Sequence, residues 1–253
     1  VKYLPGMPRF FTEGASVIAD CSGEPDLAKF QKDSALADRE APDHYIDLEY
    51  LKGERLPPTR SEYHRLVRQI APGVLVGSLP YAIIEWAQRL TIAFAECRRW
   101  PGNEAVRMRC LVYAGILCHY CQDLWMPLHT TVHYDGRTQD GISPRSGVHD
   151  RMDGLIERIS VNVDRIAAEK LPAAASRPPD DLFAAITAEL EKSHAEVDRV
   201  YSMEKELLSN ADDPRVRRLA ADCAERAMAF SAQMLAAAWR ASEKTSLPSW
   251  LTR

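Results

Sequence analysis

Residues 214–243, PRVRRLAADCAERAMAFSAQMLAAAWRASE, indicate the fold class of this protein. The stretch contains no glycine and is rich in Ala, Arg and Leu, which are good helix formers. Asp213 and Pro214 are residue types that favour the N-cap and first position of a helix. Apolar residues recur along the stretch at helical spacing: Leu219, Cys223, Met228, Phe230, Met234 and Trp239. The sequence therefore predicts one long helix over 214–243.

The glycines divide the chain into two parts. All twelve lie at or before Gly154, and the chain beyond it is again rich in Ala, Leu, Glu and Arg. Pro172, Pro178 and Pro179 indicate a loop, and a second long helix is predicted over 181–210. We expect residues from about 156 to 245 to form scaffold helices.

The first part of the chain carries helix boundaries of the same kind. Ser78 and Pro80 predict the start of a helix that ends at Trp100, and Asn103 predicts the N-cap of a helix that runs to about Trp125. A long loop is predicted over 130–147, and further helices over 7–20, 27–37, 60–71 and 149–170. Because alternating Val, Ile and Thr are nearly absent, we expect a single all-α domain over 1–253, with candidate site residues within about 20–155.

The composition excludes several classes of protein. Apolar residues make up 46% of the 253 residues, and 32 basic against 36 acidic side chains give a formal net charge of -4. These values are not those of a disordered tail or of a globally basic nucleic-acid coat. The longest uncharged runs, Cys110–Gln122 and Ala227–Trp239, are shorter than the ~18–20 residues that a membrane-spanning helix needs. We therefore expect no transmembrane segment.

Histidines and aspartates recur at a spacing that suits metal binding. His119 and Asp123 stand four residues apart on one predicted helix, and His149 and Asp153 repeat the spacing on the next. His129 lies between the pairs, just after a proline that ends the first helix. One such pair is more often an ordinary buried histidine with a polar partner. Two pairs and a fifth residue within one stretch favour a site for zinc, which binds imidazole and carboxylate groups.

An upstream segment adds two candidates. Asp26 follows Pro25, and His44 lies within residues 41–49, APDHYIDLE. An aspartate near a helix start is commonly a cap, so a structural role for Asp26 is the alternative. A metal-binding role and a structural role for His44 are equally compatible with the sequence.

These motifs resemble a known superfamily. Residues 119–129, HYCQDLWMPLH, resemble the signature H-Y/F-x-x-D-x-x-x-P-L/M-H of the zinc-dependent phospholipases C and single-strand-specific nucleases. Residues 147–153, GVHDRMD, are similar to the second element of that family, H-x3-D/E, and residues 44–49 to its upstream histidine segment. The resemblance covers about residues 20–155 and implies an all-α helix bundle of this type with clustered zinc ions. Asp26 is its least specific match, with Asp33 and Asp38 as alternatives.

The resemblance also implies the metal ligands. One zinc would be bound by Asp26, His44, His119 and Asp123, and a second by His129, His149 and Asp153. In the family, a third is bound by the bridging aspartate, here Asp123, with an N-terminal Trp and a nearby His. This sequence begins at Val1 and has no His before His44, so we expect two or three zinc ions, the third depending on N-terminal residues that this sequence does not contain.

The implied activity is hydrolysis of a phosphodiester. Zinc lowers the pKa of a bound water from about 15.7 to about 7, which supplies hydroxide at neutral pH, and the ions neutralise phosphate oxygens. Asp26 would orient the attacking water, and Lys29 would bind a phosphate oxygen; an ordinary solvated lysine is the alternative. Tyr45 would stack on a base or a cationic headgroup, unless it is buried against a neighbouring helix.

Two substrate classes compete within this superfamily. The nuclease branch usually carries Gly-Gly-Asn after the last histidine of the signature and a Trp in its second element, whereas this chain has TTVHYDG over 130–136 and Met152. These differences favour a phospholipase C-like enzyme over a nuclease or 3′-nucleotidase. The resemblance further implies a secreted or periplasmic protein, and the oligomeric state is not specified by the sequence.

Two other classes of protein remain open. An HD-type metal phosphohydrolase would use the adjacent pair His149-Asp150, and would bind metal through Asp150 rather than Asp153. Alternatively, the chain is an inactive helical binding protein. Of the remaining histidines, we expect His133 to lie on the surface and His194 to lie on a solvated helix face.

Overall fold

The computed structural model describes residues 1–31, 34–139, 141–158, 162–209 and 212–252. Within these ranges the chain forms α-helices, short 3₁₀ helices and three isolated β-bridges, with no strand. The prediction of an all-α fold is confirmed. Among the described helices, none combines the length and the apolarity that crossing a bilayer requires.

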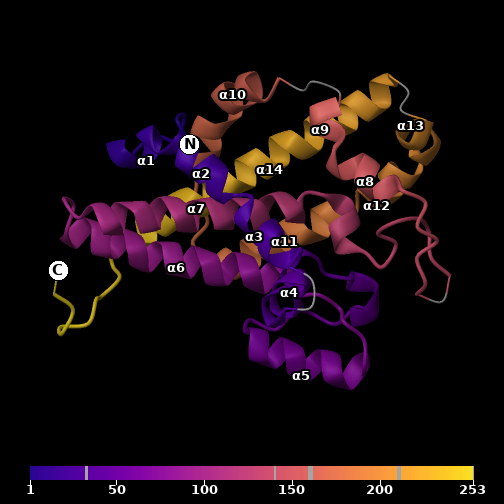
Figure 1. The fold of residues 1–253 in the computed structure, drawn as a ribbon, viewed down its shortest axis with the longest axis horizontal. Helices are drawn as coiled ribbons and strands as arrows, with labels where there is room; N and C mark the ends of the chain where they lie inside the picture. Colours follow the sequence, from indigo (N-terminus) through magenta and orange to yellow (C-terminus); the bar gives the residue numbers. More distant parts are fainter. Residues whose placement is uncertain (32–33, 140, 159–161, 210–211, 253) are drawn as a thin grey trace.

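Three long helices form the centre of the molecule (Figure 1). α6 (Leu79–Arg99) and α7 (Glu104–Leu124) run side by side as an antiparallel hairpin, and α14 (Pro214–Ala241) packs against both. α2 (Ala15–Cys21) also packs on α7, α10 (Val163–Ala175) on α14, and α11 (Leu182–His194) on α6. All three central helices were predicted, with end positions within two residues of those observed.

Local interactions explain where the central helices begin. The Asn103 side chain accepts a hydrogen bond from the backbone N–H of Val106 at 3.1 Å, and Asp213 accepts one from Arg215 at 2.7 Å. Both residues thereby satisfy N–H groups that the first turn of a helix leaves unpaired. Where α2 crosses α7, a Cβ on Gly115 would lie 2.6 Å from the carbonyl oxygen of Ile18, so the close approach requires glycine.

The buried apolar residues form two clusters. The larger lies among α1, α2, α6, α7, α11 and α14 and includes Phe11, Phe94, Leu117 and Phe230. The smaller includes Leu128, Val148, Met152, Val200 and Leu219, which come from the second half of the predicted site segment and from the C-terminal helices. This second cluster supports α8 (Val148–Asp153), which carries His149 and Asp153.

Two predicted N-terminal helices are wrong in their extent. The predicted helix 7–20 is two helices, α1 (Arg9–Glu13) and α2, that meet at Gly14. The prediction for 27–37 is also wrong, because α3 (Glu24–Lys29) begins earlier with a proline in its first turn. A separate helix, α4 (Ala35–Glu40), is capped by Ser34, whose hydroxyl accepts from the Ala37 N–H at 3.0 Å; residues 32–33 lie outside the described ranges. The predicted helix 60–71 is observed as α5 (Arg60–Ile70).

Two predicted long helices are divided into shorter ones. Residues 149–170 contain α8, α9 (Leu155–Arg158) and most of α10, with a break at Gly154; residues 159–161 lie outside the described ranges. The 181–210 segment contains α11, α12 (Val197–Tyr201) and α13 (Glu204–Ser209), and residue 210 is not described. The latter breaks have a packing reason: Ile186 and Leu190 are buried in the larger cluster, whereas Val200 and Leu207 are buried in the smaller one. A straight helix would not place all four in these two cores.

Candidate metal centre

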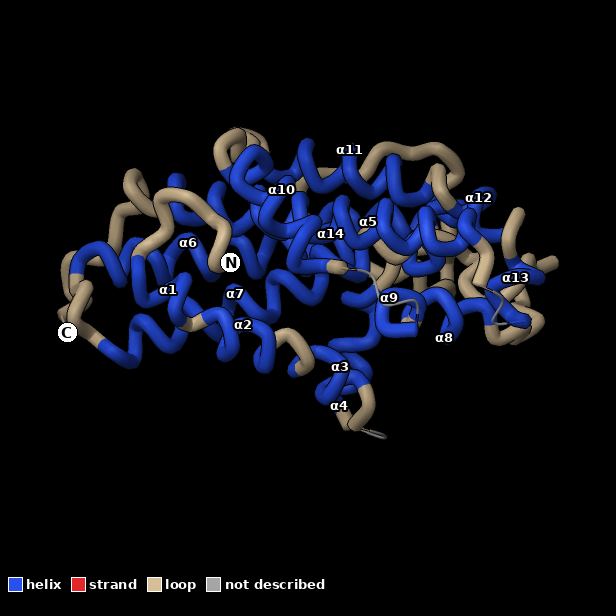
Figure 2. Tube along the Cα trace, turned by 90° about the horizontal axis from the view of Figure 1, so that it is seen from above, coloured by secondary structure: helices blue, strands red, loops and turns tan. Residues whose placement is uncertain are grey.

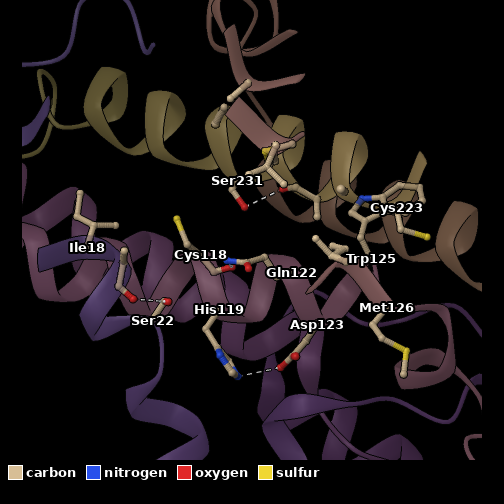
Figure 3. A pocket seen from close by; sticks show the side chains of 18 of the residues that line it. Ile18, Ser22, Cys118, His119, Gln122, Asp123, Trp125, Met126, Cys223 and Ser231 are labelled. Carbon is tan, nitrogen blue, oxygen red and sulfur yellow. Dashed lines mark hydrogen bonds and ion pairs between the residues drawn. The ribbon is translucent and has the colours of Figure 1, made fainter. Parts of the chain in front are cut away.

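α7 presents one histidine and one aspartate on the same face. His119 and Asp123 are one turn apart, and His119 Nε2 lies 3.2 Å from Asp123 Oδ2. Figure 3 shows both side chains pointing away from α14 and toward each other. The four-residue spacing seen in the sequence thus brings together an imidazole nitrogen and a carboxylate oxygen that could both bind one metal ion.

His44 joins this pair from a distant part of the chain. It lies at the end of the 3₁₀ helix η1 (Ala41–His44) and is almost completely buried. Its Nδ1 atom is 3.0 Å from both His119 Nε2 and Asp123 Oδ2, and 3.9 Å from Oδ1 of Asp26 on α3. Asp26, His44 and His119 each offer a ligand atom within 4.8 Å of the others. We call these three residues the first triad.

His129, His149 and Asp153 form a second triad, again with ligand atoms within 4.8 Å of one another. His149 Nε2 lies 3.3 Å from Asp153 Oδ2, and His129 Nε2 lies 3.7 Å from Asp153 Oδ1. The two imidazole rings stack with centroids 5.1 Å apart and an angle of 18° between their planes. His129 comes from the 3₁₀ helix η3 (Pro127–Thr130), which follows α7, and the other two come from α8.

Asp123 connects the two triads. While its Oδ2 atom faces His44 and His119, its Oδ1 atom lies 3.3 Å from His129 Nδ1. Burial alone would raise the pKa of Asp123. The charge of His129 and the contacts with His119 and His44 outweigh burial and hold the pKa well below its usual value. Asp123 is therefore a carboxylate with one oxygen directed to each triad.

The histidine–aspartate pairs also shift the pKa values of the histidines. Burial lowers the pKa of His119, but the hydrogen bond and charge of Asp123 outweigh it and raise the pKa above the usual value. Burial likewise lowers the pKa of His149, but the hydrogen bond and charge of Asp153 outweigh burial and raise this pKa above its usual value. Burial alone would raise the pKa of Asp153, but the hydrogen bond from His149 and the charges of His149 and His129 outweigh burial and lower this pKa. The pairs His119–Asp123 and His149–Asp153 therefore each favour an ionised carboxylate beside a protonated imidazole when only protons are available.

The donor set fits a divalent transition metal such as zinc. Each triad combines two imidazoles with one carboxylate, and Asp123 adds an oxygen to each. His129 Nδ1 is buried and makes no hydrogen bond within the described residues, although Asp123 is near. A buried polar atom left in this way is costly, and a cation would satisfy it.

The backbone around His44 is bound to the start of α6. The Ile46 N–H donates to the His129 carbonyl oxygen at 2.8 Å, which ties the first-triad segment directly to the second. The Leu79 N–H donates to the Tyr45 carbonyl oxygen at 3.1 Å. Gly77, at φ +81°, passes so close that a Cβ there would lie 2.2 Å from that same oxygen. Only glycine combines this φ with this contact.

A buried ion pair anchors the residue before His44. Asp43 is 3% exposed and accepts hydrogen bonds at 2.5 Å from Arg39, Arg60 and the Ser78 hydroxyl. Burial alone would raise the pKa of Asp43, but these partners, Arg60 above all, lower it. Asp43 thereby links η1 to α4, α5 and the N-cap residue of α6, and restricts the position of His44.

Three residues that support the second triad were not identified from the sequence. His194, 34% exposed on α11, donates from Nδ1 to the Thr130 carbonyl oxygen at 2.9 Å, a contact that the prediction of a solvated helix face did not include. Glu49 accepts hydrogen bonds from the Val132 N–H at 2.9 Å and from the Thr131 hydroxyl. Both contacts hold the chain just after His129. They join residues more than sixty positions apart, which leave no local sequence signal.

Asp135 is the third such residue. Its Oδ1 accepts from the N–H groups of Gly147 at 2.7 Å and of His149 at 3.3 Å, so a loop residue caps α8 in place of a preceding side chain. The Tyr134 carbonyl oxygen lies 3.3 Å from His149 Nδ1. His149 is therefore oriented by two consecutive loop residues, with Nε2 left to face Asp153.

The other predicted site residues have different surroundings. Lys29 Nζ lies 2.7 Å from Asp26 Oδ1 and 3.5 Å from His44 Nδ1, beside the first triad. Tyr45 is half-buried and is not among the residues that line the cavity described next, and burial raises its pKa to about 12. Asp150 and Asp38 are exposed and belong to neither triad, and Asp33 lies outside the described residues.

A cavity of about 800 Å³ opens beside the triads. Its polar lining includes Asp26, Lys29, His119, Asp123, His129 and Asp153, together with Gln122 and Glu157. The facing wall is mainly apolar and comes from α2, α10 and α14, as Figure 3 shows for Ile18, Cys223 and their neighbours. One wall of the cavity is therefore polar and largely acidic, and the other is mainly apolar.

No protein-family model matches the chain, and comparisons with curated proteins and with solved structures give no match. The chemistry of the site therefore has to be inferred from its residues, their geometry and the motifs that they form.

Proposed function

We propose that this protein is a zinc-dependent phosphoric-ester hydrolase of the phospholipase C type. One observation carries the proposal: two triads of histidine and aspartate, bridged by Asp123, meet at one cavity, which is lined by Asp26 and His119 of the first triad and by His129 and Asp153 of the second. Paired cation sites of this kind suit the displacement of an alkoxide from phosphorus, because negative charge develops on both the attacking and the leaving oxygen.

The first triad with Asp123 would hold one zinc ion, and the second triad with the other Asp123 oxygen would hold another. Bound zinc would supply Lewis acidity, neutralising phosphate oxygens and lowering the pKa of water. The remaining roles fall to the protein. The Asp26 carboxylate, which is 47% exposed, would accept a proton from the attacking water. Lys29, which lines the cavity beside it, would donate to a non-bridging phosphate oxygen.

The cavity favours a phospholipid over a nucleic acid. Sequence-tolerant binding of single strands relies on aromatic side chains on which bases stack. Trp125 is the one Phe, Tyr or Trp among the described residues that line the cavity, and it is 2% exposed. Small and aliphatic side chains of α2 and α14 face the triads instead. A substrate with a phosphodiester and an aliphatic portion fits this lining better than a chain of bases.

The position of Asp153 bears on the HD-type alternative. An HD-type phosphohydrolase would bind metal through Asp150, which is exposed and outside both triads, whereas Asp153 contacts both His129 and His149. The geometry therefore supports the phospholipase C-like proposal over the HD-type alternative.

Metal content and substrate preference together test the proposal. We expect about two zinc ions per chain and anomalous scattering peaks at the zinc edge beside the two triads. The loaded protein should release the phosphorylated headgroup from phosphatidylcholine, and chelation should abolish this activity. Cleavage of single-stranded DNA or 3′-nucleotides without cleavage of phosphatidylcholine would instead establish the nuclease alternative. Zinc content near zero would support an inactive helical binding protein.

A further inference from the structure

Three large apolar side chains are exposed beside the mouth of the candidate site. Leu27 on α3 and Phe30, the residue that follows α3, are 67% and 71% exposed, and Leu36 on α4 is 51% exposed. We call these residues the rim patch. Single exposed apolar residues are ordinary, but these three lie on, or directly after, two short helices that pack against each other. In Figure 2, α3 and α4 project together from the lower edge of the body.

α3 joins the rim patch to the candidate metal centre. Asp26 and Lys29, three residues apart, form an ion pair at 2.7 Å and both line the cavity. Leu27 and Phe30 have the same spacing on the adjacent face, which is turned to solvent. Lys29 Nζ lies 5.3 Å from the centroid of the Phe30 ring, so the exposed ring is next to a cavity-lining ammonium. One short helix thus presents a polar face to the site and an apolar face to its surroundings.

We propose that the rim patch docks this protein on the surface of a phospholipid bilayer, with the mouth of the cavity against the lipid headgroups. The inference rests on the proposed function, for which the substrate is a membrane lipid. Aromatic and aliphatic side chains on a protruding element enter the interface between headgroups and acyl chains. A headgroup phosphate would then lie close to Lys29 and to the first triad.

The small area of the rim patch distinguishes a bilayer from a protein partner. A specific protein interface of standard size buries roughly 800 Å² on each side, more than three side chains on two six-residue helices provide. Insertion into lipid needs no matching surface, only apolar side chains that can leave water. Acidic and basic side chains, such as Asp38 and Arg39, both flank the patch. Binding should therefore not require anionic lipid and should depend little on salt.

Cosedimentation of the full chain with phosphatidylcholine vesicles tests the proposal. A chelator prevents hydrolysis, so binding is measured separately from activity. The double variant Leu27→Ser/Phe30→Ser should bind on the order of tenfold more weakly for each side chain lost. Met108→Ser is a matched control, because Met108 is 49% exposed at the opposite end of α7 from Asp123 and its loss should leave binding unchanged. Phe30→Trp should retain binding, since Trp is favoured at membrane interfaces.

Circular dichroism of each variant verifies that the helices are intact. The proposal is overturned if the wild-type protein does not bind the vesicles, or if the double variant binds as well as the wild type. It is also overturned if the patch instead mediates self-association, seen as a dimer that Leu27→Ser/Phe30→Ser abolishes. Vesicle binding without phosphatidylcholine cleavage in the presence of zinc would leave the docking surface in place and contradict only the proposed function.

Discussion

Asp123 Oδ1 lies 3.3 Å from His129 Nδ1, and this contact joins the two triads of the candidate metal centre. The other oxygen of Asp123 lies 3.0 Å from His44 Nδ1. A single carboxylate therefore faces both places where a cation would bind, so the two sites are expected to depend on one residue.

We expect Asp123→Ala to weaken zinc binding at both sites, each by more than the roughly 10–100-fold typical of a residue outside the ligand shell. Competition with a chromogenic chelator measures both affinities. Asp150→Ala is the control, because Asp150 is exposed next to His149 and belongs to neither triad. Retention of both ions by Asp123→Ala would contradict the bridging role.

Asp135→Ala should weaken the second site selectively. The substitution removes the acceptor for the N–H groups of Gly147 and His149 and so frees the start of α8, which should reduce zinc affinity there by about 10–100-fold. Asp135→Asn should restore it, since an amide oxygen also caps a helix. Site-resolved anomalous peaks at limiting zinc separate the two sites. An equal loss of zinc affinity at the first triad would show that Asp135→Ala disturbs the whole candidate metal centre and not only the second site.

Gly77→Ala should destabilise the fold and displace the first-triad segment. Its Cβ would lie 2.2 Å from the Tyr45 carbonyl oxygen at a φ of +81°, so both strain and a backbone clash result, and we expect a loss of about 3 kcal/mol or more. Gly73→Ala is a matched control at φ +79° with no atom within 4 Å of the added Cβ, and should cost only about 1 kcal/mol. Urea unfolding measures both. Equal losses of unfolding free energy in the two variants would mean that the contact with the Tyr45 carbonyl oxygen does not contribute to the destabilisation.

Asp43→Ala should cost about 3–5 kcal/mol of unfolding free energy, because it leaves the largely buried guanidinium of Arg60 without its main partner. Glu85→Ala removes the other, 38% exposed, partner of the same arginine and should cost at most about 1 kcal/mol. Thermal and urea denaturation compare the two variants. If the order were reversed, the buried pair would not be the anchor of η1.

The pKa shifts predict how the stability of the zinc-free protein depends on pH. The raised pKa values of His119 and His149 contribute stability below about pH 6.5, which is lost as the pH rises through their folded-state pKa values. The lowered pKa values of Asp123 and Asp153 contribute stability above about pH 4, which is lost as the pH falls through their folded-state values. Stability should therefore be greatest between about pH 4 and 6.5.

The melting temperature in the presence of a chelator, measured across this range, checks that maximum. With zinc present, the melting temperature should instead increase with pH above about pH 6. Metal and protons compete for the same nitrogens, so metal affinity rises as the histidines deprotonate. A zinc-free protein whose stability kept increasing toward alkaline pH would contradict the paired histidines and aspartates described above.

Local sequence patterns determined the parts of this protein that depend on one helix at a time. Propensity and capping residues specify α6, α7 and α14, and a spacing of four residues places His119 beside Asp123 and His149 beside Asp153. These interactions act within a turn or two of the chain. They were therefore predictable before any tertiary contact was known.

Tertiary structure alone decided how distant segments meet. The division of 181–210 into three helices follows from two separate cores, and His44 reaches His119 only because Asp43 and Gly77 fix η1 against α6. The supporting roles of Asp135 and His194, and the exposure of the rim patch, likewise depend on packing between segments far apart in the chain. Periodicity and propensity describe only neighbouring residues, so they carry no information about which helix a side chain will face.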